Sequence, residues 1–150
     1  MRLHLLAIGR LRAGPQRELF AQYARRLPWP LSVREMEARR ASGRRRDHEA
    51  ALLLEAVPKG AVLVALDERG ATWSSEAFAR QIGAWRDDGL ANLAFAIGGA
   101  DGHGQALLAR ADVTLSLGAM TWPHLLARVM LAEQLYRASA ILAGHPYHRA

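Results

Sequence analysis

Apolar residues gather in short runs along the chain, separated by longer segments in which they recur every three or four positions. Runs bounded by glycine, proline or charged residues predict β-strands, here at residues 3–8, 31–36, 61–66, 93–97 and 113–117. The helical periodicity predicts α-helices at residues 15–26, 47–57, 74–88, 105–110 and 122–140. Strands that alternate with helices are typical of a mainly parallel sheet covered by helices, so we expect an α/β fold.

Residue types at two of the helix starts agree with these boundaries. Pro15 stands at a first helical position, where the missing N–H has no partner to lose. Ser74 is suited to cap the helix that follows it, and Glu76 in the first turn suits the helix dipole.

The last predicted helix has no wholly polar face. Projected at about 100° per residue, apolar side chains occupy nearly every side of it. They are Leu125, Leu126, Val129, Met130, Leu131, Ala132, Leu135 and Tyr136. A helix of this kind must be buried, and one sheet in so small a chain does not cover every side. We therefore predict a homodimer packed through this helix.

Length and composition indicate one soluble domain over residues 1–150. Hydrophobic residues make up 51% of the chain, yet charged residues interrupt every stretch long enough to span a membrane. The first nine residues are too short for a signal peptide and are interpreted as a strand, which makes the cytoplasm the expected location. The absence of cysteine excludes thiolate metal sites.

The formal net charge of +6 rests on arginine, since Lys59 is the only lysine. Arginine binds phosphate through two parallel hydrogen bonds and stacks on bases, which favours a polyanionic partner such as nucleic acid. A GC-rich genome would explain the choice of arginine over lysine, but not the positive balance. Residues 34–46 are the most biased segment and form either a solvated loop or an arm that contacts phosphates. Its clustered arginines are Arg39, Arg40, Arg44, Arg45 and Arg46.

Three strands end in turns that suit a ligand pocket. Strand 93–97 runs into Gly98-Gly99, where no side chain keeps a ligand from the backbone. Residues 118–122 follow the next strand, with Thr121 as the expected helix cap, and residues 66–70 form a third loop of this type. Carboxyl ends of parallel strands lie side by side, so these loops are predicted to enclose one adenosine-sized ligand. A tight turn without a ligand is the alternative for Gly98-Gly99.

Two common nucleotide motifs are absent. The chain has no G-x-G-x-x-G turn after its first strand and no Gly-Lys-Ser/Thr sequence, so neither a Rossmann dinucleotide site nor a P-loop is expected.

The chain closes with His145, Tyr147, His148 and Arg149 within five residues. Together they offer proton transfer, base stacking and phosphate binding, although termini are usually frayed. Zinc binding by the two histidines lacks an HExxH motif or an acidic partner at helical spacing, so no metal is expected. For His124 the sequence favours a structural role and a functional role equally.

Several segments carry a resemblance to a known family. They are residues 5–9, 66–67, 97–99, 121–124, 131–138 and 145–149. In these segments the sequence resembles the small SPOUT-class methyltransferases of the RlmH family, which methylate N3 of a pseudouridine in the ribosomal RNA of the bacterial large subunit. The sequence departs from the family at Ala100-Asp101, where Pro-Glu is usual, and at Trp122, where leucine is common.

The resemblance implies an α/β fold with a C-terminal trefoil knot and a homodimer with an S-adenosylmethionine pocket near the subunit interface. By position, the implied cofactor-binding residues are Leu66, Gly99, Gly118, Ala119, Met120, Thr121, Trp122 and Pro123. Family likeness also suggests the assembled ribosome as substrate.

Removal of the N3 proton calls for a base, for which His148 and His145 are the candidates. Tyr147 is the expected stacking platform, with Arg149, Arg137 and Arg128 as anion or phosphate contacts. Two other classes stay open: a non-catalytic ribosome- or RNA-binding protein, and a nucleotide-dependent Rossmann-type enzyme.

Overall fold

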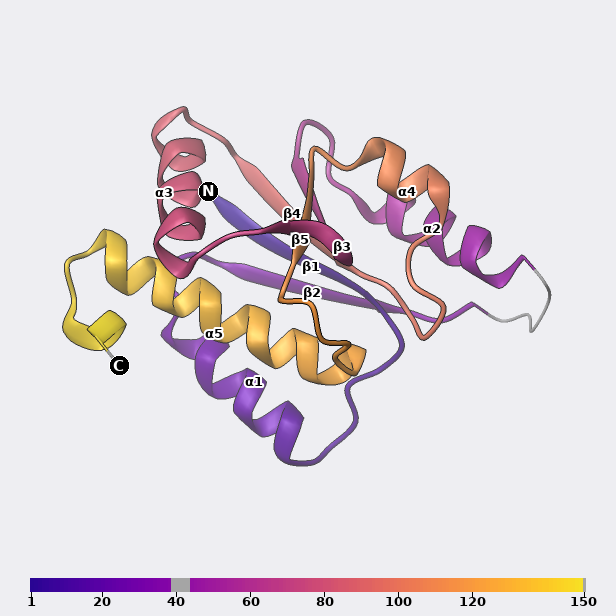
Figure 1. Cartoon of the computed structure of the whole chain (residues 1–150), viewed down its shortest axis with the longest axis horizontal. Coiled ribbons are helices and arrows are strands. Elements are labelled where there is room, and N and C mark those ends of the chain that lie inside the picture. Colours follow the sequence, from indigo (N-terminus) through magenta and orange to yellow (C-terminus); the bar gives the residue numbers. More distant parts are fainter. Residues whose placement is uncertain (39–43, 150) are drawn as a thin grey trace.

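The computed structural model describes residues 1–38 and 44–149, apart from the side chain of His148 (Figure 1). Its centre is a five-stranded parallel sheet with the order β2-β1-β4-β3-β5. The strands are β1 (Arg2–Ile8), β2 (Leu31–Met36), β3 (Val62–Thr72), β4 (Asn92–Ile97) and β5 (Val113–Ser116). The helices are α1 (Pro15–Arg26), α2 (Arg45–Ala56), α3 (Ser75–Asp87), α4 (Gln105–Arg110) and α5 (His124–Leu142), followed by the 3₁₀ turn η1 (Pro146–Arg149).

The predicted α/β fold is confirmed, and most predicted elements agree with the structure to within two residues. Ser74 caps α3 as predicted, because its hydroxyl accepts the N–H of Ala77 at 3.1 Å. Arg39 and Arg40, in the basic segment, lie outside the described residues. The trefoil knot stays a prediction, since it concerns how the chain is threaded rather than the order of its strands.

Strand β3 continues beyond its predicted end at residue 66. Leu66 and Ala71 both pair with Leu115, so residues 67–70 form an excursion within one strand and pairing resumes after it. Gly70 makes the return feasible, because a Cβ there would lie 2.6 Å from the carbonyl carbon of Thr114. The predicted loop therefore exists, but as a four-residue excursion within β3 rather than as a connection after the strand.

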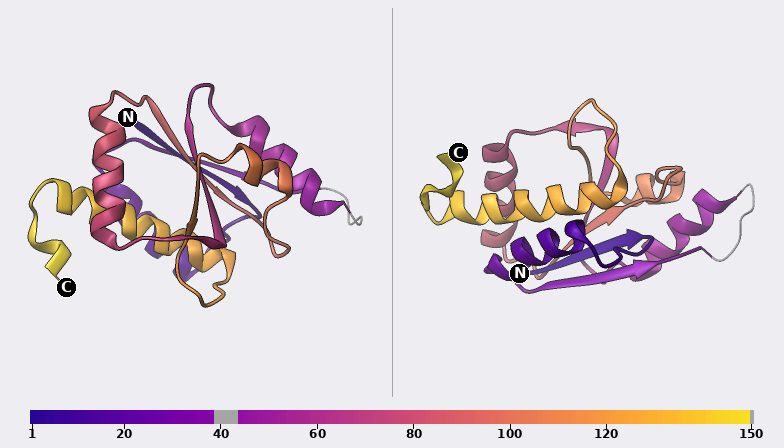
Figure 2. Two further views of the ribbon diagram at one scale, coloured as in Figure 1. Left: turned by 45° about the horizontal axis from the view of Figure 1, so that its top comes forward. Right: turned by 90° about the horizontal axis from the view of Figure 1, so that it is seen from below.

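Two apolar cores lie on the two faces of the sheet. Alternate residues of β1, β3 and β4 point to opposite faces, as the pleat requires. Helices α1, α3 and α5 cover one face, and α2 and α4 cover the other (Figures 1 and 2). Both faces are thus sealed, which leaves the carboxyl edge of the strands as the place for a site.

Helix α5 lies between α1 and α3 against the sheet (Figure 1). The prediction that it is buried is confirmed on Val129, Leu131, Ala132 and Leu135. The same chain supplies this burial, so the apolar pattern by itself does not require a second subunit. Among the described residues, no helix is long and apolar enough to cross a membrane.

Candidate functional site

The excursion within β3 and the loops that follow β4 and β5 surround a cavity of about 490 Å³. This size is within the range of small-molecule sites. Leu66 to Arg69 line it from β3, and residues 97–103 line it from the end of β4 and the loop after it. The segment after β5 contributes Leu117, Gly118, Met120, Thr121, Trp122 and His124. The predicted turns after β4 and β5 therefore share one pocket, while the third predicted loop is part of β3 rather than a strand end. That this pocket holds an adenosine-sized ligand stays a prediction.

The structure places most of the expected cofactor residues in this pocket. Those that line it are Leu66, Gly99, Gly118, Met120, Thr121 and Trp122. Ala119 and Pro123 do not line the pocket, although they lie in the same loop.

The expected cap of the last helix is wrong. Pro123 occupies the N-cap of α5, which begins at His124, and no side chain caps it. The hydroxyl of Thr121 donates instead to Glu68 at 3.1 Å. This bond ties the loop after β5 to the excursion in β3, so Thr121 fixes the pocket wall rather than the helix end.

Two buried side chains leave no room for any residue larger than glycine at position 99. A Cβ at this position would lie 3.1 Å from Oε2 of Glu49 and 3.2 Å from Cγ2 of Ile8. Both neighbours are buried, and Oε2 of Glu49 has no hydrogen-bond partner among the described residues. The other oxygen of Glu49 accepts from Arg45 at 3.0 Å. The pocket floor is therefore packed too closely for a side chain at residue 99.

Replacing Gly99 by alanine is expected to destabilise the fold by about 1–3 kcal/mol, the usual cost of overpacking. It should also weaken binding of S-adenosylmethionine, the cofactor that the family resemblance implies, because the shifted backbone lines the pocket. Calorimetry and urea unfolding measure the two effects. In an E49A background the same substitution is expected to cost less, because the carboxylate it meets is gone. An equal cost in both backgrounds would show that Glu49 does not constrain this residue.

His103 is a pocket residue that the sequence reasoning missed. Only 4% of it is exposed, and its Nε2 lies 3.2 Å from the carbonyl oxygen of Ala96, to which it donates. Burial lowers the pKa of His103, although the Ala96 carbonyl and the Asp67 carboxylate oppose this effect. The ring is therefore neutral at pH 7 and holds the end of β4. A histidine between two glycines, directly after the Gly-Gly turn, was the available signal.

The lowered pKa of His103 predicts a pH dependence of stability. The unfolded chain binds a proton near the ordinary value of 6.5, while the folded chain does so only at lower pH. Stability is thus fully present above pH 6.5 and falls as the pH drops below it. Urea unfolding at pH 7.5 and 5.5 should show the advantage of the wild type over H103Q shrinking at the lower pH. Parallel profiles for the two proteins would refute this.

The pocket rim carries charges of both signs. Arg69 donates to both carboxylate oxygens of Asp67, at 3.1 and 3.2 Å. The hydrogen bond from Arg69 lowers the pKa of Asp67 against the effect of burial. Asp101, the shortened acid of the family motif, is exposed on the pocket lining, as is Arg46 from the basic segment. The rim can therefore bind both the cationic and the anionic groups of a ligand.

His124 and Arg128 share one face of α5, as predicted, but their surroundings differ. His124 lines the pocket, and burial, with Arg128 nearby, lowers the pKa of its ring. Arg128 is 1% exposed and donates to the carbonyl oxygens of Ile8 and Gly9 and to Glu35. The two terminal guanidinium nitrogens of Arg128 are therefore bound within its own chain, which argues against the expected anion contact at this residue.

The C-terminal tail is held against the end of α5. The Tyr147 hydroxyl donates to Oε1 of Glu133 at 3.2 Å, and Arg137 donates to the same oxygen at 2.6 Å. The Tyr147 ring lies 4.6 Å from that of Tyr136. Burial raises the pKa of Tyr147, and its neighbours Tyr23 and Glu133 raise it further. Tyr147 therefore keeps its proton, and Arg137 is committed to Glu133 rather than to a phosphate.

Within one chain the tail and the pocket are not brought together. His145, whose Nδ1 accepts the N–H of Tyr147 at 3.2 Å, and exposed Arg149 lie beyond the C-terminal end of α5. The pocket lies at its N-terminal end, where His124 and Ala127 line it. A 19-residue helix is roughly 28 Å long. The described residues contain no group of three or more side chains placed to hold a metal ion.

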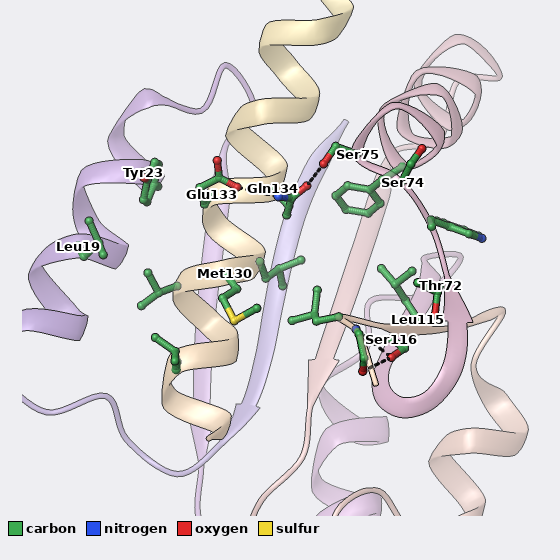
Figure 3. A pocket seen from close by; sticks show the side chains of 17 residues that line it. Leu19, Tyr23, Thr72, Ser74, Ser75, Leu115, Ser116, Met130, Glu133 and Gln134 are labelled. Carbon is green, nitrogen blue, oxygen red and sulfur yellow. Dashed lines mark hydrogen bonds between the residues drawn. The ribbon is translucent and has the colours of Figure 1, made fainter. Parts of the chain in front are cut away.

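A second, mostly apolar cavity of about 500 Å³ adjoins the pocket across Leu115, Leu117 and Gly118. Figure 3 shows that Leu19 and Tyr23 of α1 and Met130 and Glu133 of α5 are among the residues that line it. Its far wall is closed by a hydrogen bond of 2.7 Å from Ser75 to Gln134. Leu19 is 41% exposed, and Met120 and Trp122 in the adjacent loop are 73% and 40% exposed. Large apolar side chains thus face solvent beside the pocket.

Comparisons with known proteins agree with this arrangement. The sequence model described as "Predicted SPOUT methyltransferase" matches residues 1–148. A protein of Rhodospirillum centenum named Ribosomal RNA large subunit methyltransferase H is 60% identical, with 100% of both chains covered. A protein of the same name from Dinoroseobacter shibae is 56% identical over 99% of both chains.

Solved structures share the fold at low sequence identity. A methylase-family protein of Haemophilus influenzae superposes with a TM-score of 0.59 at 10% identity, covering 97% of this chain and 69% of the other. A methyltransferase of Legionella pneumophila, solved with bound SAM, gives 0.53 at 13% identity, covering 92% and 66%. The match to the family model and the full-length relatives show that this chain belongs to the SPOUT methyltransferase family.

Proposed function

We propose that the protein transfers a methyl group from S-adenosylmethionine to N3 of a pseudouridine in large-subunit ribosomal RNA, acting in the cytoplasm on the assembled ribosome. The observation that carries the proposal is the pocket formed by the excursion within β3 and the loops after β4 and β5, which contains most of the residues expected to bind the cofactor. Full-length relatives named as large-subunit ribosomal RNA methyltransferases support the choice of substrate.

The residues present fit the cofactor. Gly98, Gly99, Gly102 and Gly118 leave the backbone of the pocket bare, so peptide groups can bind a nucleoside directly. At Gly118, with φ of +120°, a Cβ would meet nothing within 4 Å, so the space beside it is open. The acids Asp67, Glu68 and Asp101 on the lining suit the positive charge of a sulfonium and an ammonium group. When bound, the cofactor supplies a methyl group activated by its sulfonium.

The active unit is a homodimer in which one chain provides the pocket and a second chain provides the tail. Two facts support this arrangement. Within one chain α5 separates the tail from the pocket, and the apolar cavity beside the pocket offers Leu19, Met120 and Trp122 to a second copy. An antiparallel approach of two α5 helices would bring each tail to the pocket of the other chain.

The tail then performs the proton transfer. His148 or His145 accepts the N3 proton of the target base, so that the nitrogen lone pair is free when it meets the methyl group. Protonated Tyr147 stacks on or donates to the base, and Arg149 binds a phosphate or the developing anion. The pocket loops hold the methyl donor in line with N3, so orientation supplies much of the rate.

Mass mapping of methyl marks on large-subunit RNA tests the proposal. Ribosomes from cells that lack the protein should carry an unmethylated pseudouridine, and adding the purified protein with S-adenosylmethionine should restore the mark. A non-catalytic ribosome-binding protein would leave RNA unmodified and show no heat of cofactor binding in calorimetry. That result would replace the enzyme assignment by the binding-protein alternative.

A further inference from the structure

Three arginines near the start of the chain form no ion pair with the residues that the structure describes. Six ion pairs in the described part of the chain occupy other arginines. Arg10, Arg12 and Arg17 belong to none of them, and all three are exposed. They come from the loop between β1 and α1 and from the first turn of α1. Unpaired charges close together repel one another, so this grouping favours an anionic ligand.

The three side chains line a concave surface rather than a flat one. A cavity of about 560 Å³ lies between the loop, α1 and the edge strand β2, with Phe20 and Val33 among its apolar walls. Its one acidic residue, Glu35, is committed to Arg128 at 2.6 Å and to the backbone N–H of Leu11. The electrostatic potential in the cavity is therefore positive and comes mainly from the three arginines.

The start of α1 adds to this field. Its N-cap is Gly14, and no side chain satisfies the first amides of the helix. The positive end of the helix dipole, with free N–H groups, attracts phosphate at the same place as the guanidinium groups.

This surface adjoins the cofactor pocket. Arg10 follows Gly9 at the end of β1, and a Cβ on Gly9 would lie 3.6 Å from Nε2 of His124. His124 lines the cofactor pocket. The arginines and the cofactor pocket therefore lie on opposite sides of the first turn of α5. A polyanion bound at the arginines would pass close to the pocket.

We propose that Arg10, Arg12 and Arg17 bind backbone phosphates of the RNA that flanks the target nucleoside. The inference rests on the proposed function for the identity of the polyanion. Arginine forks match phosphate oxygens, and phosphate contacts fix register without reading sequence. The three arginines thus position the RNA, while the tail and pocket carry out the transfer.

The test compares two full-length variants that each lose three positive charges. R10Q/R12Q/R17Q removes the proposed site, and R2Q/K59Q/R80Q removes exposed charges at the opposite edge of the sheet and on α3. Binding to large ribosomal subunits is measured against salt concentration, since each lost phosphate contact lowers the slope of log K against log [salt] by about one. Melting temperatures and cofactor affinity of both variants should equal those of the wild type.

We expect the first variant to bind the subunit about 10- to 100-fold more weakly, with a slope lower by two to three, as loss of three phosphate contacts predicts. Its KM for the ribosome should rise, while kcat at saturating ribosome stays unchanged. The control should match the wild type in slope and KM. Equal slopes for the two variants would overturn the inference. A wild type that binds subunits but transfers no methyl would overturn the proposed function alone, because the slopes still decide the role of the arginines.

Discussion

A chain that ends at Gly144 is expected to lose methyl transfer by about 10²- to 10⁴-fold, the usual contribution of a general base. Its affinity for S-adenosylmethionine should stay unchanged, because the pocket lies at the other end of α5. Single-turnover methylation of large subunits and calorimetry with the cofactor measure the two properties separately. Undiminished turnover would remove His145, Tyr147, His148 and Arg149 from the mechanism.

A mixing experiment shows which chain supplies the tail. The truncated chain keeps its pocket, and a full-length G99V chain keeps its tail but should not bind the cofactor. If the tail acts in the pocket of a second copy, mixed dimers regain activity that neither protein has alone. No recovery in a mixture proven to exchange subunits would place the tail in the pocket of its own chain. Y147F, which keeps the ring but not the bond to Glu133, controls for tail docking.

The order and bounds of the helices and strands could be predicted because both faces of the sheet are covered. Buried parallel strands read as short apolar runs, and helix starts carry local signals such as Pro15 and Ser74. The pocket could be predicted for a related reason. In a parallel sheet all carboxyl ends lie at one edge, so the glycine-rich turns after β4 and β5, which flank β3 on its two sides, open toward the same space.

Buried polar groups could not be predicted in the same way. Glu49, His103 and Arg128 are all more than nine-tenths buried, although charged and imidazole side chains are usually exposed. What buries each of them is a contact with a distant segment: Gly99 for Glu49, Ala96 for His103, and β1 for Arg128. The sequence pattern shows the type of each residue, but it does not show which distant segment will pack over that residue in the fold.

The pocket in which the tail acts depends on quaternary structure, which a single chain does not contain. The residue types at 145–149 predict proton transfer and stacking, and the structure docks Tyr147 on Glu133. Which pocket the tail serves depends on how two chains pack. The apolar pattern of α5 could not reveal this packing, since α1 and α3 already cover much of that helix.

Replacing Arg128 by methionine is expected to destabilise the protein by about 3–5 kcal/mol, the cost of breaking a buried ion pair. The guanidinium bonds Ile8 and Gly9 at 2.9 and 2.8 Å and Glu35 at 2.6 Å. Without it the buried carbonyl oxygen of Ile8 and the part-buried carbonyl oxygen of Gly9 lose their donor, and the carboxylate of Glu35 loses its cation. Because the bonds end on β1, the loop that carries Arg10 and Arg12 should also lose its anchor.

Urea unfolding measures this loss, and the melting temperature should fall by roughly 6–20 °C for a domain of this size. E35Q is expected to cost less, since an amide oxygen still accepts from Arg128 and from the N–H of Leu11. The matched control is R86M, which breaks the exposed pair with Asp87 and should leave the stability nearly unchanged, because solvent screens this pair. If R128M lowers the free energy of unfolding by no more than R86M does, the buried guanidinium does not hold the end of β1 to α5.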